Sequence, residues 1–329
     1  MHLIEAQKII TSDPKHARAP HAAEYSHGSA FTQGAYKPIE QGVVPITDSG
    51  FIHADAAYDV VSASAGYIFR MEDHIKRFTA SCEKFALVNP YTEEQTVEIL
   101  NNLVKLTGLK DAYIWWAVTR GELSDSDRVK LEYVNKFYAF VTPYMFIHGD
   151  EMRTRGAKVK ISTDYLRIPE TSVDPTAKNF HWMDMKLSIL EARTAGAEWS
   201  VLLDAKGNLT EAPGCNIFII KDDTLKTPNS GCLEGITRQT VFELAEELGL
   251  RLEVTKVPSE ELLEADEAFL TSTAGGVMPV SFVDGRSLGG QNGPGELTTQ
   301  LHNLYWEKRW NGWLGEAIDY ETPFSVSAG

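Results

Sequence analysis

The sequence is poor in cysteine, in long apolar runs and in positive charge. Its 329 residues include three cysteines, Cys82, Cys215 and Cys232, and none of them forms the C-x-x-C spacing of a zinc or redox site. We interpret them as buried free thiols of a reducing compartment. No stretch approaches the roughly 20 apolar residues of a membrane span. The first twenty residues have no signal-peptide core either, so we expect a cytoplasmic protein.

The charge balance is acidic. Asp and Glu number 46 against 31 Lys and Arg, which gives a formal net charge of −15. Nucleic acids and anionic membranes are bound by clustered basic side chains, so neither is expected as a main partner. A small anionic ligand held by a few local groups is not excluded. At roughly 150 residues per domain the length predicts about two domains, with cores that need no disulfide or metal.

The apolar pattern predicts a small α/β domain at 1–142, beginning with an arm at 1–34, a linker at 143–155 and a larger domain at 156–329. Helices are expected after Asp73 and Thr92 and at 182–194, 236–248 and 297–309, and strands at 58–61, 67–69, 112–119, 137–142, 158–162, 200–203, 216–220, 252–257 and 268–271. Strands outnumber helices in the second half, which favours an α+β fold with a barrel-like large domain.

Two segments have the backbone chemistry of an anion site. Gly235-Ile236-Thr237-Arg238 opens an amphipathic helix, whose first amides and dipole favour a phosphate that glycine allows to approach closely. Ser272-Thr273-Ala274-Gly275-Gly276 follows an apolar strand and offers hydroxyls and amides to an oxyanion. Many helices and turns of this composition bind nothing, so each segment alone is a weak indication.

Two single residues add acid–base and nucleophilic chemistry. Lys178 lies between a proline-bearing loop and an aromatic run, where burial favours a nucleophilic amine; an exposed loop lysine is the alternative. Glu211 precedes a buried strand, where an edge glutamate is the alternative. An amine, a lone carboxylate and two phosphate anchors are together the components of a pyridoxal 5′-phosphate (PLP) site. In such a site the carboxylate keeps the pyridine nitrogen protonated.

Five motifs occur in order between residues 36 and 305. They are Phe69-Arg70…Asp73-His74…Arg77, Asp174-Pro175…Lys178-Asn179, Leu209-Thr210-Glu211…Gly214…Asn216, Gly235-Ile236-Thr237-Arg238 and Thr273-Ala274-Gly275-Gly276. In this order they resemble the fold-type-IV PLP enzymes, the group of the branched-chain and D-amino-acid aminotransferases. Within that group the chain is most similar to the (R)-selective amine transaminases.

The resemblance implies roles for single residues. Lys178 is the implied catalytic residue, which forms a Schiff base with the cofactor and moves the proton between cofactor and substrate. The implied cofactor-binding residues are Arg77, the backbone of Ile236 and Thr237, and Thr273 for the phosphate, Glu211 for the pyridine nitrogen and Leu233 for the ring. The implied substrate-binding residues are His53, Tyr58, Val60, Trp115, Ala117, Arg128, Trp182 and Ala274. No metal is expected.

Strand alternation and two departures from the family pattern bear on the substrate pocket. Trp115 and Ala117 fall on one face of their strand and Trp116 on the other, although both tryptophans could equally fill the core. Ser64 stands where close relatives have a tryptophan, and Cys215 where they usually have an aromatic residue. Both departures concern the range of substrate sizes and leave the cofactor prediction unchanged.

The resemblance implies a homodimer that transfers an amino group from a primary amine, (R)-configured, to a keto acid such as pyruvate in two half-reactions. A branched-chain or D-amino-acid aminotransferase is the first alternative. A PLP lyase of the aminodeoxychorismate type is the second. The pairing of Lys178 with Glu211 argues against a third, a non-catalytic PLP-binding protein.

Overall fold

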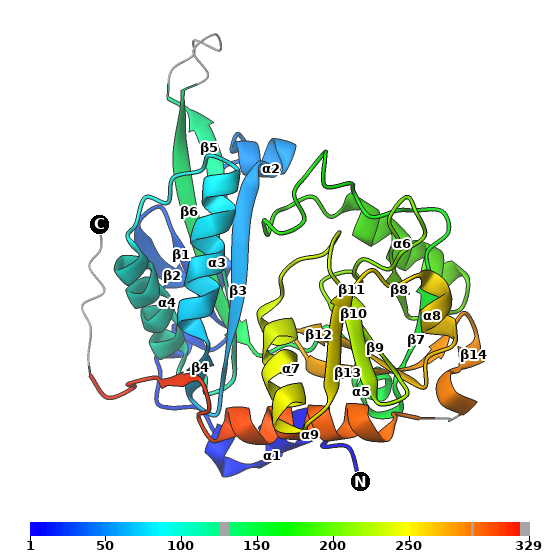
Figure 1. The fold of residues 1–329 in the computed structure, drawn as a ribbon. Coiled ribbons are helices and arrows are strands. Elements are labelled where there is room, and N and C mark those ends of the chain that lie inside the picture. The colour runs from blue at the N-terminus through cyan, green and yellow to red at the C-terminus, as the bar shows by residue number, and fades with distance from the viewer. Residues whose placement is uncertain (125–131, 291–292, 323–329) are drawn as a thin grey trace. The chain divides into compact units, whose positions relative to one another are not determined.

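The computed structural model describes residues 1–124, 132–290 and 293–322, and the chain divides into two compact units (Figure 1). The first unit consists of Lys8–Met145, Ala177–Phe180 and Arg309–Gly329. The second unit consists of Met1–Gln7, Phe146–Thr176 and His181–Lys308. The predicted two-domain α+β architecture is confirmed.

The units are not continuous in sequence, which distinguishes them from the predicted domains at 1–142 and 156–329. The first seven residues belong to the second unit, whereas Ala177–Phe180 and the residues after Lys308 belong to the first. Such crossings are made by contacts between residues far apart in the chain, and a local apolar pattern does not reveal them.

The first unit contains a seven-stranded antiparallel sheet in the order β15-β4-β3-β5-β6-β1-β2. Its strands are β1 (Ser29–Thr32), β2 (Ala35–Pro38), β3 (Ala56–Ser64), β4 (Tyr67–Phe69), β5 (Ala112–Leu123), β6 (Tyr133–Pro143) and β15 (Gly315–Ala317). Its helices are α2 (Ser49–His53), α3 (Met71–Lys84) and α4 (Glu93–Thr107), together with most of α1 (Ala6–Ser12) and the short 3₁₀ turns Pro14–His16, Ala23–Tyr25 and Ile39–Gln41.

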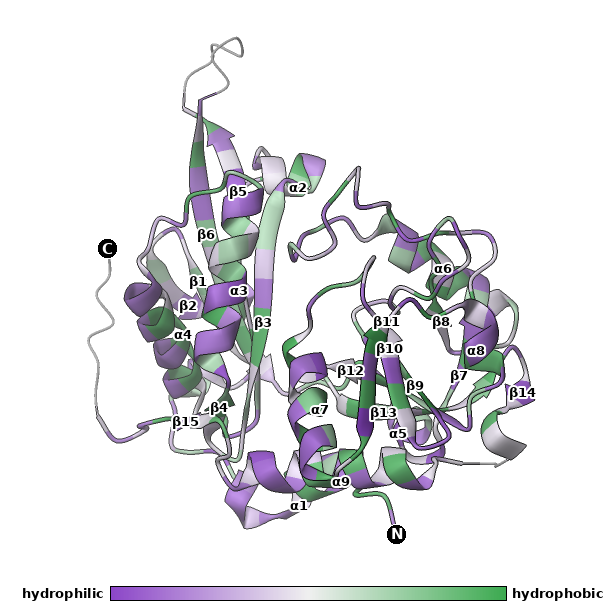
Figure 2. Ribbon diagram, in the orientation of Figure 1, coloured by the Kyte–Doolittle hydropathy of each residue, from purple (hydrophilic) through white to green (hydrophobic). Residues whose placement is uncertain are grey.

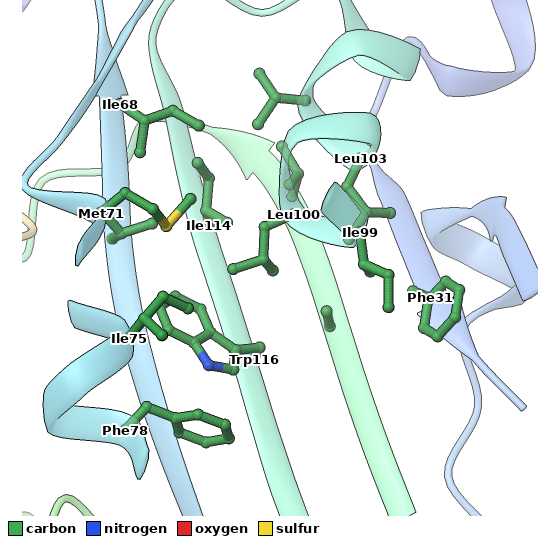
Figure 3. Close-up of a cluster of buried hydrophobic side chains, with 14 of the residues drawn as sticks. Phe31, Ile68, Met71, Ile75, Phe78, Ile99, Leu100, Leu103, Ile114 and Trp116 are labelled. Atoms are coloured by element: carbon green, nitrogen blue, oxygen red, sulfur yellow. The ribbon is translucent and has the colours of Figure 1, made fainter. Parts of the chain in front are cut away.

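The core of the first unit lies between the sheet and helices α3 and α4. Figure 3 shows apolar side chains of α3 and α4 packed against those of the strands, and Trp116 of β5 lies 5.6 Å from Phe78 of α3 between ring centroids. Figure 2 shows hydrophilic and hydrophobic residues alternating along both helices, as expected of helices with one buried face. Trp116 therefore fills the core, on the face of β5 opposite to Trp115.

The second unit contains a mixed sheet in the order β11-β10-β9-β12-β13-β7-β8, with β14 paired to β13. Its strands are β7 (Ala157–Ile161), β8 (Trp199–Val201), β9 (Asn216–Lys221), β10 (Thr224–Pro228), β11 (Arg251–Thr255), β12 (Glu267–Ser272), β13 (Gly276–Val283) and β14 (Arg286–Ser287). Its helices are α5 (Asp150–Arg155), α6 (Met183–Thr194), α7 (Ile236–Glu247), α8 (Ser259–Leu263) and most of α9 (Glu296–Trp310), with a 3₁₀ turn at Leu288–Gly290.

The connection from β10 to β11 positions the predicted phosphate segment. These two strands are parallel, so the chain must cross over between them, and it does so through α7. The helix begins directly after Gly235, as predicted. Among the described residues no helix is long and apolar enough to cross a membrane.

Some local predictions are wrong. Asp73 was expected to be a helix N-cap, but α3 begins at Met71 after Arg70, and the Asp73 carboxylate accepts a hydrogen bond from Nε of Arg70 at 2.6 Å. Thr92 does cap α4, in a reciprocal hydrogen-bonded box with Gln95. The predicted linker contains α5. The strands that were not predicted are β1, β2, β10, β13, β14 and β15; of these, β10 and β13 show no clear alternation of apolar and polar residues.

All three cysteines are buried and free, as predicted. Burial raises the pKa of the Cys82 and Cys232 thiols to about 12. Thiols with so high a pKa are protonated at neutral pH and therefore poor nucleophiles.

Candidate active site

Lys178 lies at the edge of β3 in the first unit. Its backbone amide donates to Oγ of Ser81 on α3 at 3.1 Å, and its carbonyl accepts from the amide of Tyr58 at 3.0 Å. Asn179 forms a bridge with Ala57 of the same strand. The side chain is partly buried, and its Nζ lies 4.4 Å from the centre of the Tyr58 ring. The lysine is therefore held by strand-like pairing, and the alternative of an exposed loop lysine is wrong.

An aromatic cluster surrounds this lysine. It consists of Tyr58, Trp115, Phe140 and Phe180. The Tyr58 ring lies 5.9 Å from Trp115 and 5.5 Å from Phe180, and Trp115 stacks on Phe140 at 5.1 Å. Register explains the arrangement, because Val60 of β3 pairs with Trp115 and Tyr58 pairs with Ala117. The four predicted substrate residues of these two pairs, Tyr58, Val60, Trp115 and Ala117, therefore share one face of the sheet.

Asp59 projects from the opposite face of β3 and binds two residues of α3. Its side chain is fully buried; Oδ1 accepts from Nδ1 of His74 at 2.8 Å and from Nη2 of Arg77 at 2.6 Å, while Oδ2 accepts from Nε of Arg77 at 2.8 Å. Burial opposes ionisation of Asp59, but Arg77 and His74 outweigh it and hold its pKa well below the usual range. Burial lowers the pKa of His74, so its imidazole is neutral at pH 7.

This ion pair restrains the arginine that was predicted to bind the phosphate. Two-point bonding to a buried carboxylate fixes the plane of the Arg77 guanidinium. The alternative interpretation of Arg77, a solvated residue on a helix face, is wrong, because its side chain is only 11% exposed. Its role toward a phosphate stays a prediction.

Glu211 lies in the second unit, where it is buried beside Arg167. Its Oε1 accepts from Nε of Arg167 at 2.8 Å, and its Oε2 accepts from the backbone amide of Leu233 at 3.1 Å. The structure thus brings together two of the predicted cofactor residues, Glu211 and Leu233. The alternative of an exposed edge glutamate is wrong, because only 4% of Glu211 is accessible.

The start of α7 is built around Gly235. No side chain caps the helix, and a Cβ at position 235 would lie 2.0 Å from Oδ1 of Asn216. Asn216 is itself held by a 2.7 Å hydrogen bond from its Nδ2 to the carbonyl of Leu233. Ile236 and Thr237, both buried, are the first two residues of the helix, where backbone amides have no acceptor within the helix.

The turn between β12 and β13 carries Thr273 and Ala274. The amide of Ala274 donates to Oγ of Ser272 at 3.2 Å, and its carbonyl accepts from the amide of Ile147 at 2.8 Å. Gly276 has a positive φ of 68°, and a Cβ there would lie 2.4 Å from Cε1 of Tyr305. Glycine is therefore needed at position 276 for two reasons, backbone conformation and space.

The remaining predicted substrate residues are distributed over both units. His53 is exposed at the end of α2, and Val60 and Ala117 are buried in the sheet of the first unit. Trp182 precedes α6 in the second unit and lies against Gly214, where an added Cβ would be 3.1 Å from its ring. Arg128 lies outside the described residues.

Ser64 and Cys215, the two predicted departures from the family pattern, are both buried. Ser64 donates to Oδ1 of Asp111 at 2.8 Å and accepts from Nε1 of Trp310 at 3.1 Å. An indole from the C-terminal segment thus contacts Ser64. Cys215 is buried in the core of the second unit.

The residues present fit PLP. The uncapped start of α7 offers amides to a phosphate, and Gly235 leaves there the space that a Cβ would fill. The hydroxyl of Thr271 is buried without a hydrogen-bond partner, and Thr271 pairs across the sheet with Asn216, which contacts Gly235. A buried carboxylate, Glu211, matches a protonated ring nitrogen.

Three charged residues that bond to the predicted site residues or to their partners were not predicted from the sequence, namely Asp59, Arg167 and Asp184. Arg167 also donates from Nη1 to Oδ2 of Asp184 at 2.7 Å. The one local signal for Arg167 was a basic residue within the apolar run Leu166 to Ile168. Its partners follow 17 and 44 residues later, so no short motif links them.

Comparison with known proteins gives a consistent family. The model of the family described as Amino-transferase class IV matches residues 56–283. A branched-chain-amino-acid aminotransferase of Pseudomonas aeruginosa is 33% identical over 78% of this chain and 83% of its own length. A D-alanine aminotransferase of Bacillus licheniformis is 30% identical over 78% of this chain and 89% of its own length.

Solved structures agree with these relatives. A branched-chain aminotransferase from Thermoproteus uzoniensis with norvaline has a TM-score of 0.78 and 26% identity, covering 88% of this chain and 99% of that one. The PLP form of a branched-chain amino acid aminotransferase from Thermobaculum terrenum has a TM-score of 0.77 and 25% identity, covering 87% and 95%.

Proposed function

Because the chain belongs to the class IV aminotransferases, which use PLP, we propose that it transfers the amino group of an apolar primary amine, (R)-configured, to a keto acid such as pyruvate. The observation that carries the proposal is the aromatic cluster around Lys178. Its rings present apolar faces beside the amine at which the donor reacts. An aryl or alkyl substituent buried there would gain about 25 cal/mol per Å² of apolar surface removed from water.

The chain's own residues divide the work. PLP, when bound, supplies an electron sink for the bond that breaks at the donor carbon. Lys178 would hold the cofactor through its Nζ, and the same Nζ would move the proton at the donor carbon. Glu211 holds a proton at the ring nitrogen. The phosphate-binding roles that the family resemblance implies for Arg77, for the amides of Ile236 and Thr237 and for Thr273 are part of the proposal.

A second candidate is a branched-chain or D-amino-acid aminotransferase. The relatives favour it over the first candidate, because they are named as aminotransferases for branched-chain amino acids and D-alanine. An amino acid donor brings a carboxylate, which needs a cation in the substrate pocket. Arg128 was predicted for that role and lies outside the described residues.

A donor panel decides between the candidates. Initial rates are measured with (R)- and (S)-1-phenylethylamine, L-leucine and D-alanine, using pyruvate or 2-oxoglutarate as acceptor, and products are resolved by chiral chromatography. A kcat/KM for the (R)-amine at least tenfold above those of both amino acids supports the first candidate. A tenfold preference for either amino acid overturns it in favour of the second. Pyruvate released from aminodeoxychorismate without any acceptor identifies a lyase.

Trp115→Leu tests the aromatic cluster directly. Loss of the indole is expected to lower kcat/KM for the (R)-amine about 10- to 100-fold, because apolar contact with the donor's substituent is lost. Tyr113→Leu is the matched control, because Tyr113 is an aromatic residue on the same face of β5 whose strand partner, Ser62, lies four residues along β3 from Tyr58. An equal loss in both variants contradicts the proposal.

We also propose that the enzyme is a homodimer. Residues 43–52 of the first unit expose five large apolar side chains, which favours burial against a second copy. They are Val43, Val44, Ile46, Phe51 and Ile52. Sedimentation equilibrium is expected to give twice the chain mass of 36.6 kDa, and the double variant Ile46→Glu, Phe51→Glu is expected to be monomeric. A wild-type monomer overturns this proposal.

A further inference from the structure

Arg167 is bonded to two carboxylates within the second unit. Its Nε donates to Oε1 of Glu211 at 2.8 Å and its Nη1 to Oδ2 of Asp184 at 2.7 Å. The side chains of Arg167, Glu211 and Asp184 are 5%, 5% and 16% exposed. Burial lowers the pKa of Arg167, but Glu211 and Asp184 outweigh burial and raise it, so the guanidinium is firmly charged.

The three groups together carry one net negative charge. Three further hydrogen bonds to the carboxylates come from neutral backbone amides. Ile168 donates to Oδ2 of Asp184 at 2.8 Å, Met185 to Oδ1 of Asp184 at 2.8 Å, and Leu233 to Oε2 of Glu211 at 3.1 Å. Amides stabilise the anions but do not neutralise them. Without Asp184, the Arg167–Glu211 pair would be neutral, and a neutral pair attracts a neighbouring cation far less than an anionic cluster does.

Asp184 lies where the local structure favours a negative charge. Asp184 is the second residue of α6, a twelve-residue helix whose dipole favours a negative charge in its first turn. Arg167 is anchored through its backbone amide, which donates to the carbonyl of Leu203 at 2.9 Å. The charge of Asp184 is thus fixed at one end of a rigid chain of two charge-assisted hydrogen bonds, and Glu211 is at the other end.

We propose that Asp184 is a positioning residue that acts through Arg167 and Glu211 to stabilise the proton on the pyridine nitrogen of the cofactor. The inference rests on the proposed function only for the role of Glu211 and not for the identity of the donor. A protonated ring nitrogen adds the one positive charge that neutralises the cluster. Asp184 therefore influences the protonation of the cofactor ring through two intervening side chains, Arg167 and Glu211.

Asp184→Asn tests the proposal in the holoenzyme. Asparagine keeps an oxygen that can accept from Arg167 and Ile168, but it removes the charge. Enzyme reconstituted with PLP labelled with ¹⁵N at the ring nitrogen is titrated by NMR, because the ¹⁵N shift reports protonation directly. We expect about a tenfold weaker hold on the ring proton, so the midpoint of the titration falls by about one pH unit. We also expect about a tenfold lower kcat with the donor's KM unchanged.

Glu191→Gln is the matched control. Glu191 lies on the same helix and also accepts a backbone hydrogen bond, from Thr163 at 3.0 Å, but its ion-pair partner is Lys160. The control is expected to leave the ring-nitrogen titration unchanged. Asp184→Glu retains the charge and is expected to restore the wild-type titration at least in part.

The ring-nitrogen titrations of the Asp184 variants can also overturn the proposal. A titration in Asp184→Asn equal to that of the wild type overturns the proposal, and so does an equal shift in Asp184→Asn and Asp184→Glu, which would indicate a structural role. Asp184→Ser, measured in parallel, provides the charge-free variant if Asp184→Asn does not fold. If Glu211→Gln leaves the ring nitrogen unchanged, the role of Glu211 itself fails. The donor panel tests the proposed reaction separately.

Discussion

Gly235 and Asn216 are so close that a Cβ on residue 235 would lie 2.0 Å from Oδ1 of Asn216. The Asn216 side chain is held in this position, because its Nδ2 donates to the carbonyl of Leu233. Together the two residues determine the position of the first turn of α7, where the phosphate of PLP is proposed to bind.

Gly235→Ala is expected to weaken PLP binding about tenfold or more, because the added methyl group must displace either Asn216 or the first turn of α7. The dissociation constant is measured by fluorescence titration of the apoenzyme. Gly149→Ala is the matched control, since Gly149 also precedes a helix in an extended conformation and has nothing within 4 Å of an added Cβ. Unchanged affinity in Gly235→Ala would contradict the proposed phosphate site.

Asp59→Asn is expected to destabilise the protein by about 3 kcal/mol, because it leaves the buried Arg77 guanidinium without its counter-charge. Urea unfolding at pH 7.5 measures the loss. Asp55→Asn is the control, because Asp55 pairs with Arg120 at 3.0 Å but its side chain is 33% exposed, and a loss below about 1 kcal/mol is expected. Equal losses of unfolding free energy in the two variants would show that the buried ion pair stabilises the protein no more than the partly exposed one.

The pH dependence of the same ion pair has a defined sign. The folded-state pKa of Asp59 is depressed, so the unfolded chain takes up a proton at higher pH than the folded protein does. Its contribution to stability is therefore complete above about pH 4 and is lost as the pH falls further. In acid titrations the wild type and Asp59→Asn are expected to converge in stability below pH 4.

His148→Phe is expected to make the protein more resistant to mild acid. The imidazole is fully buried, neither ring nitrogen has a hydrogen-bond partner, and burial lowers its pKa to about 4. The unfolded chain binds this proton below about pH 6.5 and the folded protein does not, so the wild type loses about 2 kcal/mol between pH 6.5 and 5 through this residue. Phenylalanine keeps the edge contact with Trp199, which lies 4.9 Å away.

Urea unfolding at pH 7 and pH 5 measures this effect. The difference between the two pH values is expected to be smaller in His148→Phe than in the wild type by about that amount. His27→Gln is the control, since His27 has a side chain 78% exposed, and its loss is expected to leave the difference unchanged. If the free energy of unfolding of His148→Phe differs between pH 7 and pH 5 by as much as that of the wild type, the prediction is wrong.

Lys178→Ala is expected to lose at least about 10³-fold in kcat, because no amine remains to hold the cofactor and move the proton. Borohydride reduction followed by mass spectrometry is expected to attach the cofactor to Lys178 in the wild type and to no residue in the variant. Lys110→Ala is the control, since this lysine is also partly buried over an aromatic ring, that of Tyr320, but belongs to no predicted site, and full activity is expected. Cofactor attached elsewhere would show that the lysine is misassigned.

The family, the cofactor and most of the helices and strands could be predicted from the sequence. The reason is that each of these depends on a short segment: a glycine before an amphipathic helix predicts α7, and ordered motifs around Lys178, Glu211 and Gly235 indicate PLP. Strand alternation likewise separated Trp115 from Trp116 correctly, because it is a local rule.

Which charged side chains pair with one another could be learned only from the fold. Asp59 reaches Arg77 from 18 residues away and Arg167 reaches Glu211 from 44, and neither spacing belongs to a helix or a strand. It also placed Lys178 in the unit of the N-terminal sheet, through pairing with β3. Local propensity is set by neighbours in the chain, whereas a buried charge is stabilised by whichever partner the fold brings to it, and that partner is known only once the fold is known.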